Sequence, residues 1–174
     1  MSGVEISELL IAGVLVLLSA FFSSAESAFL ALQNTARLRH LVSIGSQGAV
    51  RVDEMLREPG RLLSTILLGN NLVNIGFAAL VTAITLSFLE EGTGIAASTA
   101  VATTILLLLG EIVPKTLAVR NAEQVAFLFA RPLKLVELML FPVVIILHRI
   151  SDLATFGNRT QEASITEDEL RTLI

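Results

Sequence analysis

The segment GEIVPK, Gly110 to Lys115, decides how the chain is organised, because it places a carboxylate, a glycine and a proline directly after the apolar run 95–109. A charged side chain inside a membrane span costs ~2.5 to 3.5 kcal/mol on insertion scales, so Glu111 indicates a functional role. Pro114 has no N–H, and in an α-helix the missing donor would have bonded the carbonyl of Gly110. A free backbone oxygen beside a carboxylate predicts a cation site.

The composition indicates an integral membrane protein. Of the 174 residues, 53% are hydrophobic and 16% are charged, and the mean hydropathy is +0.77, which is too apolar for a soluble domain of this length. The chain has no cysteine, so a bound metal would need oxygen ligands or a histidine. His40 and His148 lie beside basic residues and far apart, and we expect them to be interfacial polar residues. The basic residues form no dense patch and the chain has no Trp or Tyr, which argues against nucleic-acid binding.

Three apolar segments predict three transmembrane helices, at about residues 6–32, 62–89 and 95–119. Each exceeds the ~20 residues that a spanning helix needs. A cleaved signal peptide is the alternative for the first, but Glu5 and Glu8 stand in place of a basic n-region, and the apolar stretch is too long. We therefore predict an all-α transmembrane domain over residues 1–160.

Two further regions predict helices on the cytoplasmic side of the membrane. In residues 34–58, Gly45 and Gly48 divide a charged, amphipathic stretch into two short helices that we expect at the membrane surface.

Residues 123–150 are apolar enough for a fourth span, but charges and two prolines, Pro132 and Pro142, interrupt them. A fourth span would also place the charged C-terminal tail outside. We therefore predict a bent amphipathic helix along the cytoplasmic interface.

The distribution of basic residues predicts the topology. Lysines and arginines lie either between residues 37 and 61 or from Lys115 onward, whereas the N-terminus and the turn at residues 90–94 carry acids. With three spans, the positive-inside rule places the N-terminus outside and the C-terminus in the cytoplasm. We expect the protein in the plasma (inner) membrane.

Residues 161–174 predict the start of an acidic cytoplasmic helix. Thr166 and Glu169 form a capping box, and acidic residues occupy the first turn. The sequence stops inside this helix, and the simplest interpretation is that a cytoplasmic domain has been removed.

Polar residues on the three predicted spans repeat a helical spacing. Ser23 and Ser27 are four residues apart and share one face of the first span, with Glu26 beside them, and Asn70 and Asn74 repeat this spacing on the second. Ser23, Asn70 and Gly110 each lie about eight to nine residues, or roughly 12 to 14 Å, from the cytoplasmic end of their span. Three polar clusters are therefore expected at one depth.

Hydroxyl, amide, carbonyl and carboxylate oxygens are hard ligands, suited to Mg²⁺, Ca²⁺ or Na⁺ and unsuited to soft metals. Structural alternatives remain open for each residue alone. The serines are compatible with helix packing, and Asn70 and Asn74 with hydrogen bonds between helices. Glu111 is compatible with an ion pair to Lys115 at i+4, and Glu26 with a cap or a pair to a basic residue of the surface helices.

Three stretches together resemble the signature motifs of the membrane domain of the cyclin M and CorB/CorC family. They are FSSAES with LAL in residues 22–32, LGNNLVN in residues 68–74, and GEIVPK in residues 110–115. Ser24 stands where the family frequently has a glycine. Residues 166–170 resemble the start of the family's acidic helical bundle, which leads to paired cytoplasmic CBS domains.

The resemblance implies a homodimer in the lipid membrane, whose subunits each have three spanning helices, two short helices and a belt-like juxtamembrane helix. It implies Mg²⁺ export, with Na⁺ as the candidate coupling ion. The residues that would hold the ion are Ser23, Ser27, Asn70, Glu111 and the carbonyl of Gly110. The residues that would support or couple to this site are Glu26, Asn74, Pro114 and Lys115.

The leading hypothesis is a secondary transporter that releases Mg²⁺ outward by alternating access. The alternative is a Mg²⁺ sensor or scaffold that reports occupancy to the missing cytoplasmic domain. We expect no enzyme, because the sequence has no Ser/His, Asp/Asp or His-Glu-x-x-His arrangement.

Overall fold

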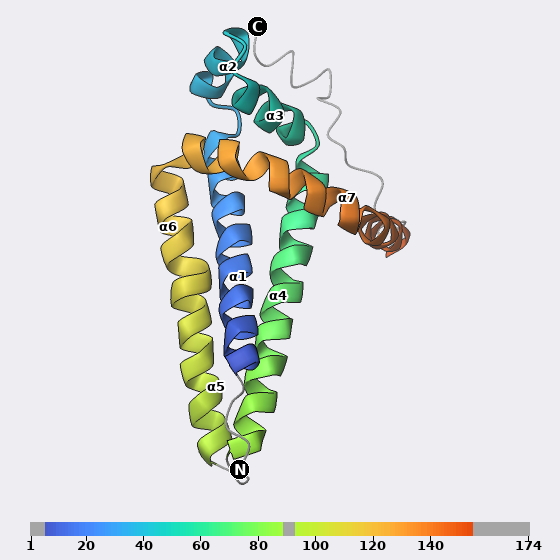
Figure 1. Cartoon of the computed structure of the whole chain (residues 1–174). Helices are drawn as coiled ribbons and strands as arrows, with labels where there is room; N and C mark the ends of the chain where they lie inside the picture. The colour runs from blue at the N-terminus through green and yellow to red at the C-terminus, as the bar shows by residue number, and fades with distance from the viewer. Residues whose placement is uncertain (1–5, 89–92, 155–174) are drawn as a thin grey trace, which may run out of the picture. The chain divides into compact units, whose positions relative to one another are not determined.

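The computed structural model describes residues 6–88 and 93–154, and within them the secondary structure is entirely helical. The chain divides into two compact units, residues 1–139 and 140–174, and the second contributes the end of α7 to the described part. The prediction of an all-α fold is confirmed. In order, the elements in Figure 1 are α1 (Ile6–Leu32), α2 (Ala36–Ser43), α3 (Gln47–Leu56), α4 (Pro59–Phe88), α5 (Thr93–Ile105), the π-helix η1 (Leu106–Ile112), α6 (Val113–Arg120) and α7 (Ala122–Ala154).

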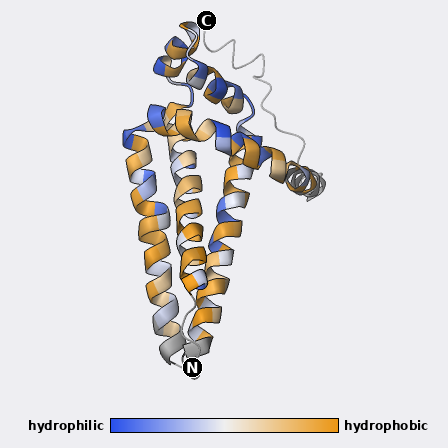
Figure 2. Ribbon diagram, viewed as in Figure 1, coloured by the Kyte–Doolittle hydropathy of each residue, from blue (hydrophilic) through white to orange (hydrophobic). Residues whose placement is uncertain are grey.

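Three segments are long and apolar enough to cross a membrane, namely Ile6–Leu32, Pro59–Leu86 and Ser98–Arg120. This confirms the prediction of three candidate spans, and Figure 2 shows hydrophobic residues along most of each. Helix α4 begins at Pro59, three residues before the predicted start, because a proline in the first turn loses no intrahelical hydrogen bond. The acidic residues Glu90 and Glu91 of the predicted turn lie outside the described residues, as does the predicted capping box at Thr166.

Helix α1 is the centre of the three-helix bundle. It contacts α4 on one side and η1 and α6 on the other, and α4 also contacts α5 (Figure 1). Glycines permit the close approach: a Cβ on Gly69 would collide with the ring of Phe22, and one on Gly110 would lie 2.9 Å from Ser19 Oγ. Small residues at such crossings are typical of membrane helices.

The two short helices, α2 and α3, are joined by a glycine in the left-handed region. Gly45 has φ +80°, and its N–H bonds the carbonyl of Val42, which closes α2. Gly48 lies inside α3, where it packs against the ring of Phe127. The prediction that both glycines separate the helices was therefore wrong for Gly48, whose role is contact with α7.

Helix α7 runs from Ala122 to Ala154, so the segment predicted as one bent helix over residues 123–150 is a single helix, and the expectation that Pro132 and Pro142 interrupt it was wrong. Pro132 is exposed. Ala130 and Leu133 are buried in the core of the first unit. That core is formed by apolar side chains of α1, α2, α3, α4, α6 and α7.

Candidate functional site

Four oxygen atoms from three elements meet around Ser19 of α1. Its hydroxyl oxygen lies 2.8 Å from Asn74 Oδ1 and 3.4 Å from Asn70 Oδ1, both on α4. It also lies 3.4 Å from the carbonyl oxygen of Gly110 in η1. Ser19 is completely buried. A serine hydroxyl has one hydrogen, so it can fully satisfy one of these three acceptors at a time. We call these four oxygens the oxygen cluster.

The oxygen cluster joins three residues that the sequence singled out, Asn70, Asn74 and Gly110, at one depth of the bundle. The contribution of α1 is Ser19, which the sequence analysis missed. The available signal was its spacing, because Ser19 lies four residues before Ser23 and therefore extends the same helical face.

Ser23 lies one turn farther along this face of α1, and its side chain is fully buried. Its hydroxyl oxygen has no hydrogen-bond partner among the described residues. Buried polar groups are nearly always paired, and leaving one unpaired costs about 1 to 3 kcal/mol. Ser27, another turn along, is half-buried, and within the described residues no hydrogen bond joins it to the oxygen cluster. An unpaired hydroxyl beside the cluster indicates a missing partner.

The backbone near Pro114 differs from the α-helix that the sequence predicted. Residues 106–112 form a π-helix, in which the N–H of Val113 bonds the carbonyl of Leu108, five residues earlier. Helix α6 then resumes at Val113, so the proline lies where the register changes. The carbonyl oxygen of Gly110, inside this π-helix, lies 3.4 Å from the hydroxyl oxygen of Ser19. Such π-helical turns occur frequently at functional sites.

A lysine and two carboxylates form a second polar group on α1, η1 and α6. Lys115 Nζ lies 3.0 Å from Glu26 Oε2 and 3.4 Å from Glu111 Oε1. The structure thus contains the Glu111 to Lys115 pair that the sequence left open. It gives Glu26 a partner on α6 and not on the surface helices. We call these three residues the carboxylate–lysine group. It carries a net charge of −1, from two carboxylates and one ammonium.

The two polar groups follow each other along α1. Ser19 and Glu26 are seven residues apart, or about 10 Å along a helix, and Ser23 lies between them. On the third span, Gly110 is the partner of Ser19, and Lys115 is the partner of Glu26. The two polar groups therefore follow in the same order along both spans. Within the described residues, no group of three or more His, Asp or Glu side chains could hold a metal. A cation at this position would therefore bind mainly neutral oxygens.

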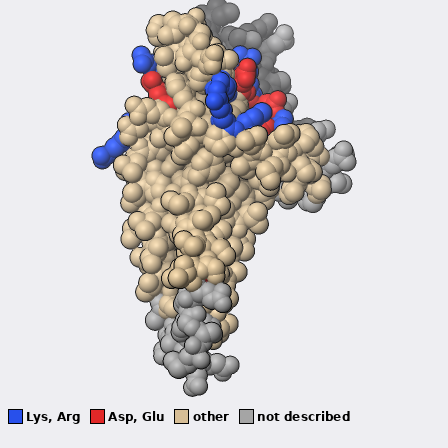
Figure 3. All heavy atoms as spheres, viewed as in Figure 1, with Lys and Arg blue, Asp and Glu red and all other residues tan. Residues whose placement is uncertain are grey.

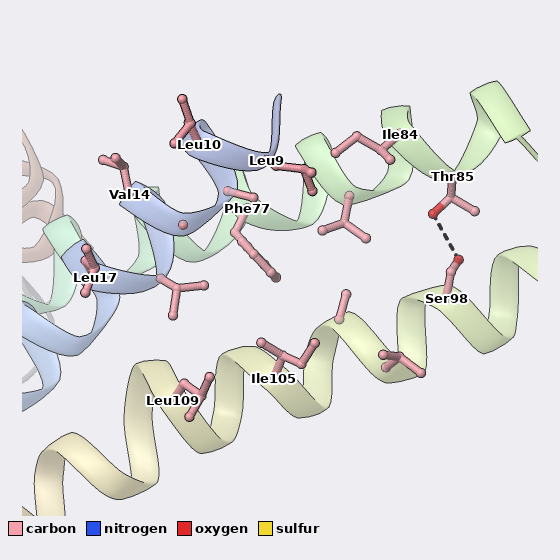
Figure 4. Close-up of a pocket in the computed structure, with 16 residues that line it drawn as sticks. Leu9, Leu10, Val14, Leu17, Phe77, Ile84, Thr85, Ser98, Ile105 and Leu109 are labelled. Atoms are coloured by element: carbon pink, nitrogen blue, oxygen red, sulfur yellow. Dashed lines mark hydrogen bonds between the residues drawn. The ribbon is translucent and has the colours of Figure 1, made fainter. Parts of the chain in front are cut away.

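An apolar cavity of about 1020 Å³ lies between α1, α4 and α5, toward the end of the bundle at which α4 ends and α5 begins. Figure 4 shows Phe77, Ile105 and Leu109 lining it, with a hydrogen bond of 3.0 Å between Thr85 and Ser98. Its other lining residues are almost all aliphatic. This apolar cavity offers a cation no charged ligand, so the candidate site is the oxygen cluster.

Comparison with known proteins gives a consistent family. Residues 10–174 match the cyclin M transmembrane N-terminal domain. The chain is 36% identical over 162 residues to the UPF0053 inner membrane protein YfjD of Escherichia coli, which covers 90% of this chain and 37% of that protein. It is 34% identical over 179 residues to a UPF0053 protein of Haemophilus influenzae, covering 100% of this chain and 42% of that protein.

A plant protein matches to a similar degree. The chain is 39% identical over 169 residues to a chloroplastic DUF21 domain-containing protein of Arabidopsis thaliana, covering 95% of this chain and 25% of that protein. The chain thus spans less than half the length of these relatives. Its three spans, its motifs and these matches agree: it is a multi-pass membrane protein that belongs to the cyclin M transmembrane domain family.

Proposed function

We propose that this domain binds Mg²⁺ between α1, α4 and η1 and exports it across the plasma membrane, driven by inward movement of Na⁺. The observation that carries the proposal is the oxygen cluster. With the amides oriented as in the structure, three acceptor oxygens surround one hydroxyl, and a second hydroxyl on the same face of α1, that of Ser23, is buried without a partner. Surplus lone pairs inside the bundle, together with the buried hydroxyl of Ser23, favour a cation as the missing partner.

The spacing of the oxygens is compatible with a small cation, and their chemical type favours a hard one. Mg²⁺ binds oxygen ligands at 2.0–2.1 Å in an octahedron, so adjacent ligands lie about 3 Å apart. The separations of 2.8 and 3.4 Å around Ser19 are hydrogen-bond distances, and they are also compatible with adjacent ligands of such an octahedron. Amide, hydroxyl and carbonyl oxygens also match the hard ligands that Mg²⁺ prefers.

The carboxylate–lysine group would supply the charge that neutral ligands lack. Lys115 is closer to Glu26, at 3.0 Å, than to Glu111, at 3.4 Å. Glu111 is therefore the carboxylate more easily released toward an ion, while Glu26 retains the lysine. Gly110, the residue before Glu111, already contributes its carbonyl oxygen to the oxygen cluster. In this proposal Glu111 exchanges Lys115 for Mg²⁺ when the ion binds.

An interrupted helix beside a polar cluster supports transport. Transporter cores commonly use discontinuous helices whose backbone carbonyls coordinate cations. Access to that site then alternates between the two sides of the membrane. Here the third span changes from α to π and back to α across residues 106–113. We further propose an orientation with the N-terminus outside, and assembly of two copies into a dimer as the family resemblance implies.

Mg²⁺ binding and Mg²⁺ flux, measured on the same variants, test this proposal. We expect Asn74→Ala to weaken Mg²⁺ binding in isothermal titration by about 10- to 100-fold, the range seen when groups supporting a metal site are removed. Flux into or out of liposomes, followed with a Mg²⁺-sensitive dye, should fall with it. Thr104→Ala is the matched control, because that hydroxyl is exposed and bonds the carbonyl of Ala100 within its own helix.

The same experiment separates transport from the sensor alternative. Loss of binding with unchanged flux in Asn74→Ala would exclude transport through this site. Mg²⁺ binding by the unaltered protein without any flux would favour a sensor that acts on a cytoplasmic domain. Binding of Ca²⁺ well above Mg²⁺ would contradict the ion assignment.

A further inference from the structure

A groove of about 360 Å³ lies between α3 and α7, apart from the oxygen cluster. Its polar rim carries three basic residues, Arg51, Arg131 and Lys134, and one acidic residue, Glu54. We propose that this groove binds the phosphate headgroup of an anionic membrane lipid. The occupant would be a structural lipid, and the proposal does not depend on the transport function.

The basic side chains of the groove lack enough carboxylate partners. Within the described residues Arg131 makes no ion pair or hydrogen bond, and the contact of Arg51 is a 3.4 Å hydrogen bond to the amide oxygen of Gln47. Lys134 lies 3.0 Å from Glu137. Guanidinium groups without carboxylates are suited to the fork-shaped recognition of a phosphate.

The buried carboxylate of Glu137 is shared and cannot neutralise the groove. Its side chain is 6% exposed, and it pairs with Arg61 of α4 at 2.5 Å as well as with Lys134. Arg61 also pairs with Glu58, at 3.4 Å. The three cations that line the groove, Arg51, Arg131 and Lys134, therefore face two carboxylates, Glu54 and the shared Glu137, a surplus of one positive charge. Two other arginines at this end have carboxylate partners outside the groove: Arg37 pairs with Glu123, and Arg57 pairs with Asp53.

Apolar surface continues directly from the basic rim. Met55 and Ala130 line the groove and are buried. Leu135 also lines it and is 65% exposed, and Leu138 is exposed one turn along the same face of α7. A free phosphate ion would use the arginines alone. A lipid would use both parts, with its phosphate on Arg131 and an acyl chain along the leucines.

The groove also lies near the start of a candidate span, where headgroups are expected. Helix α3 ends at Leu56 and the second candidate span starts at Pro59, so Met55 precedes the apolar span by four residues and Arg51 by eight. On the face in Figure 3, the coloured charged atoms gather at the end where α2, α3 and α7 lie, and the surface over the long helices carries none. Basic pockets at such boundaries are typical sites for anionic lipid headgroups.

Native mass spectrometry of the protein, released from nanodiscs made of equal parts phosphatidylglycerol and phosphatidylcholine, tests this proposal. We expect the protein to retain phosphatidylglycerol preferentially. The double variant Arg51→Gln with Arg131→Gln should lose that preference by about fivefold for each arginine, the effect expected of one basic residue near an anionic surface. Neither substitution leaves a carboxylate unpaired, so the fold should persist, and Arg131→Lys should retain the lipid.

The matched control is Arg39→Gln with Arg120→Gln, which removes the same charge from exposed positions outside the groove. Equal loss in this control would show general surface attraction and overturn the proposal. Inorganic phosphate in millimolar excess should not displace the lipid, and displacement would identify free phosphate as the occupant. Leu135→Ser should weaken retention as well, and unchanged retention would contradict the acyl-chain contact.

Discussion

The same three-helix bundle contains two regions of opposite character, the apolar cavity and the oxygen cluster. Around the cavity, α1, α4 and α5 present almost only aliphatic side chains, with one hydroxyl pair, Thr85 and Ser98, among its described lining residues. Around the oxygen cluster, α1 packs against both α4 and η1, and neutral oxygens surround a single hydroxyl. Helices that need only to span the membrane tolerate the first arrangement, whereas the second is costly unless it binds something.

Replacing a glycine by alanine should give the largest difference between the two regions, in both stability and Mg²⁺ binding. A Cβ on Gly110 would lie 2.9 Å from Ser19 Oγ and 3.1 Å from its Cβ. Gly110→Ala should therefore displace Ser19, destabilise the protein by about 1 to 3 kcal/mol as overpacking does, and abolish detectable Mg²⁺ binding. Thermal unfolding and isothermal titration measure the two effects.

The control for this variant comes from the apolar cavity. Gly13 lines the cavity, and a Cβ there would meet no atom within 4 Å. Gly13→Ala should leave Mg²⁺ binding unchanged, and it should not lower stability because alanine favours a helix over glycine. If both alanine variants lost binding equally, the contrast between the two regions would be false.

Removing the lysine should have a smaller effect, and of the opposite sign. Lys115 competes with any cation for Glu111. Lys115→Gln should raise Mg²⁺ affinity by up to about fivefold, since a partly exposed ion pair is worth ~0.2 to 1 kcal/mol. Isothermal titration at low and moderate salt should show the gain shrinking as salt screens the charges.

Lys134→Gln serves as the control for this prediction, because it removes a lysine from the pair with Glu137, away from the oxygen cluster. It should not change Mg²⁺ affinity. A fall in affinity in Lys115→Gln would show that the lysine supports the ion site, and the exchange of Lys115 for Mg²⁺ at Glu111 would then be wrong.

The difference between the regions also explains what the sequence revealed. Asn70, Asn74, Gly110 and Glu111 are conspicuous because each is unusual in an apolar span. Helix spacing predicted a common depth for Ser23, Asn70 and Gly110, and in the structure Ser19, one turn before Ser23, contacts the other two. Ser19 escaped notice because a single serine in such a run is ordinary in membrane helices. The helical face is evident from the sequence, but which of its serines reaches the asparagines depends on how closely α1 and α4 pack.

Backbone register and distant pairs were less accessible from the sequence. Pro114 has no N–H, so the sequence shows that one backbone hydrogen bond is lost. In a π-helix each N–H bonds the carbonyl five residues earlier and not four, and the sequence does not show which carbonyl loses its donor. The pair between Glu26 and Lys115 joins the first and third spans, and only the packed bundle brings them to 3.0 Å. Pro132 was expected to interrupt α7, but it is exposed and the helix continues.

The smallest effect is expected from a substitution in the hydroxyl pair of the apolar cavity, Thr85 and Ser98. Thr85 is 6% exposed, and its hydroxyl lies 3.0 Å from that of Ser98. Hydrogen bonds between membrane helices average about 0.6 kcal/mol, so Thr85→Val should lower the unfolding free energy in detergent by about that amount. Mg²⁺ titration should give the unaltered affinity, because valine keeps the shape of threonine and the cavity holds no ligand for the ion. A clear loss of Mg²⁺ binding would mean that the ion path runs through the cavity, which would then have to admit water during transport.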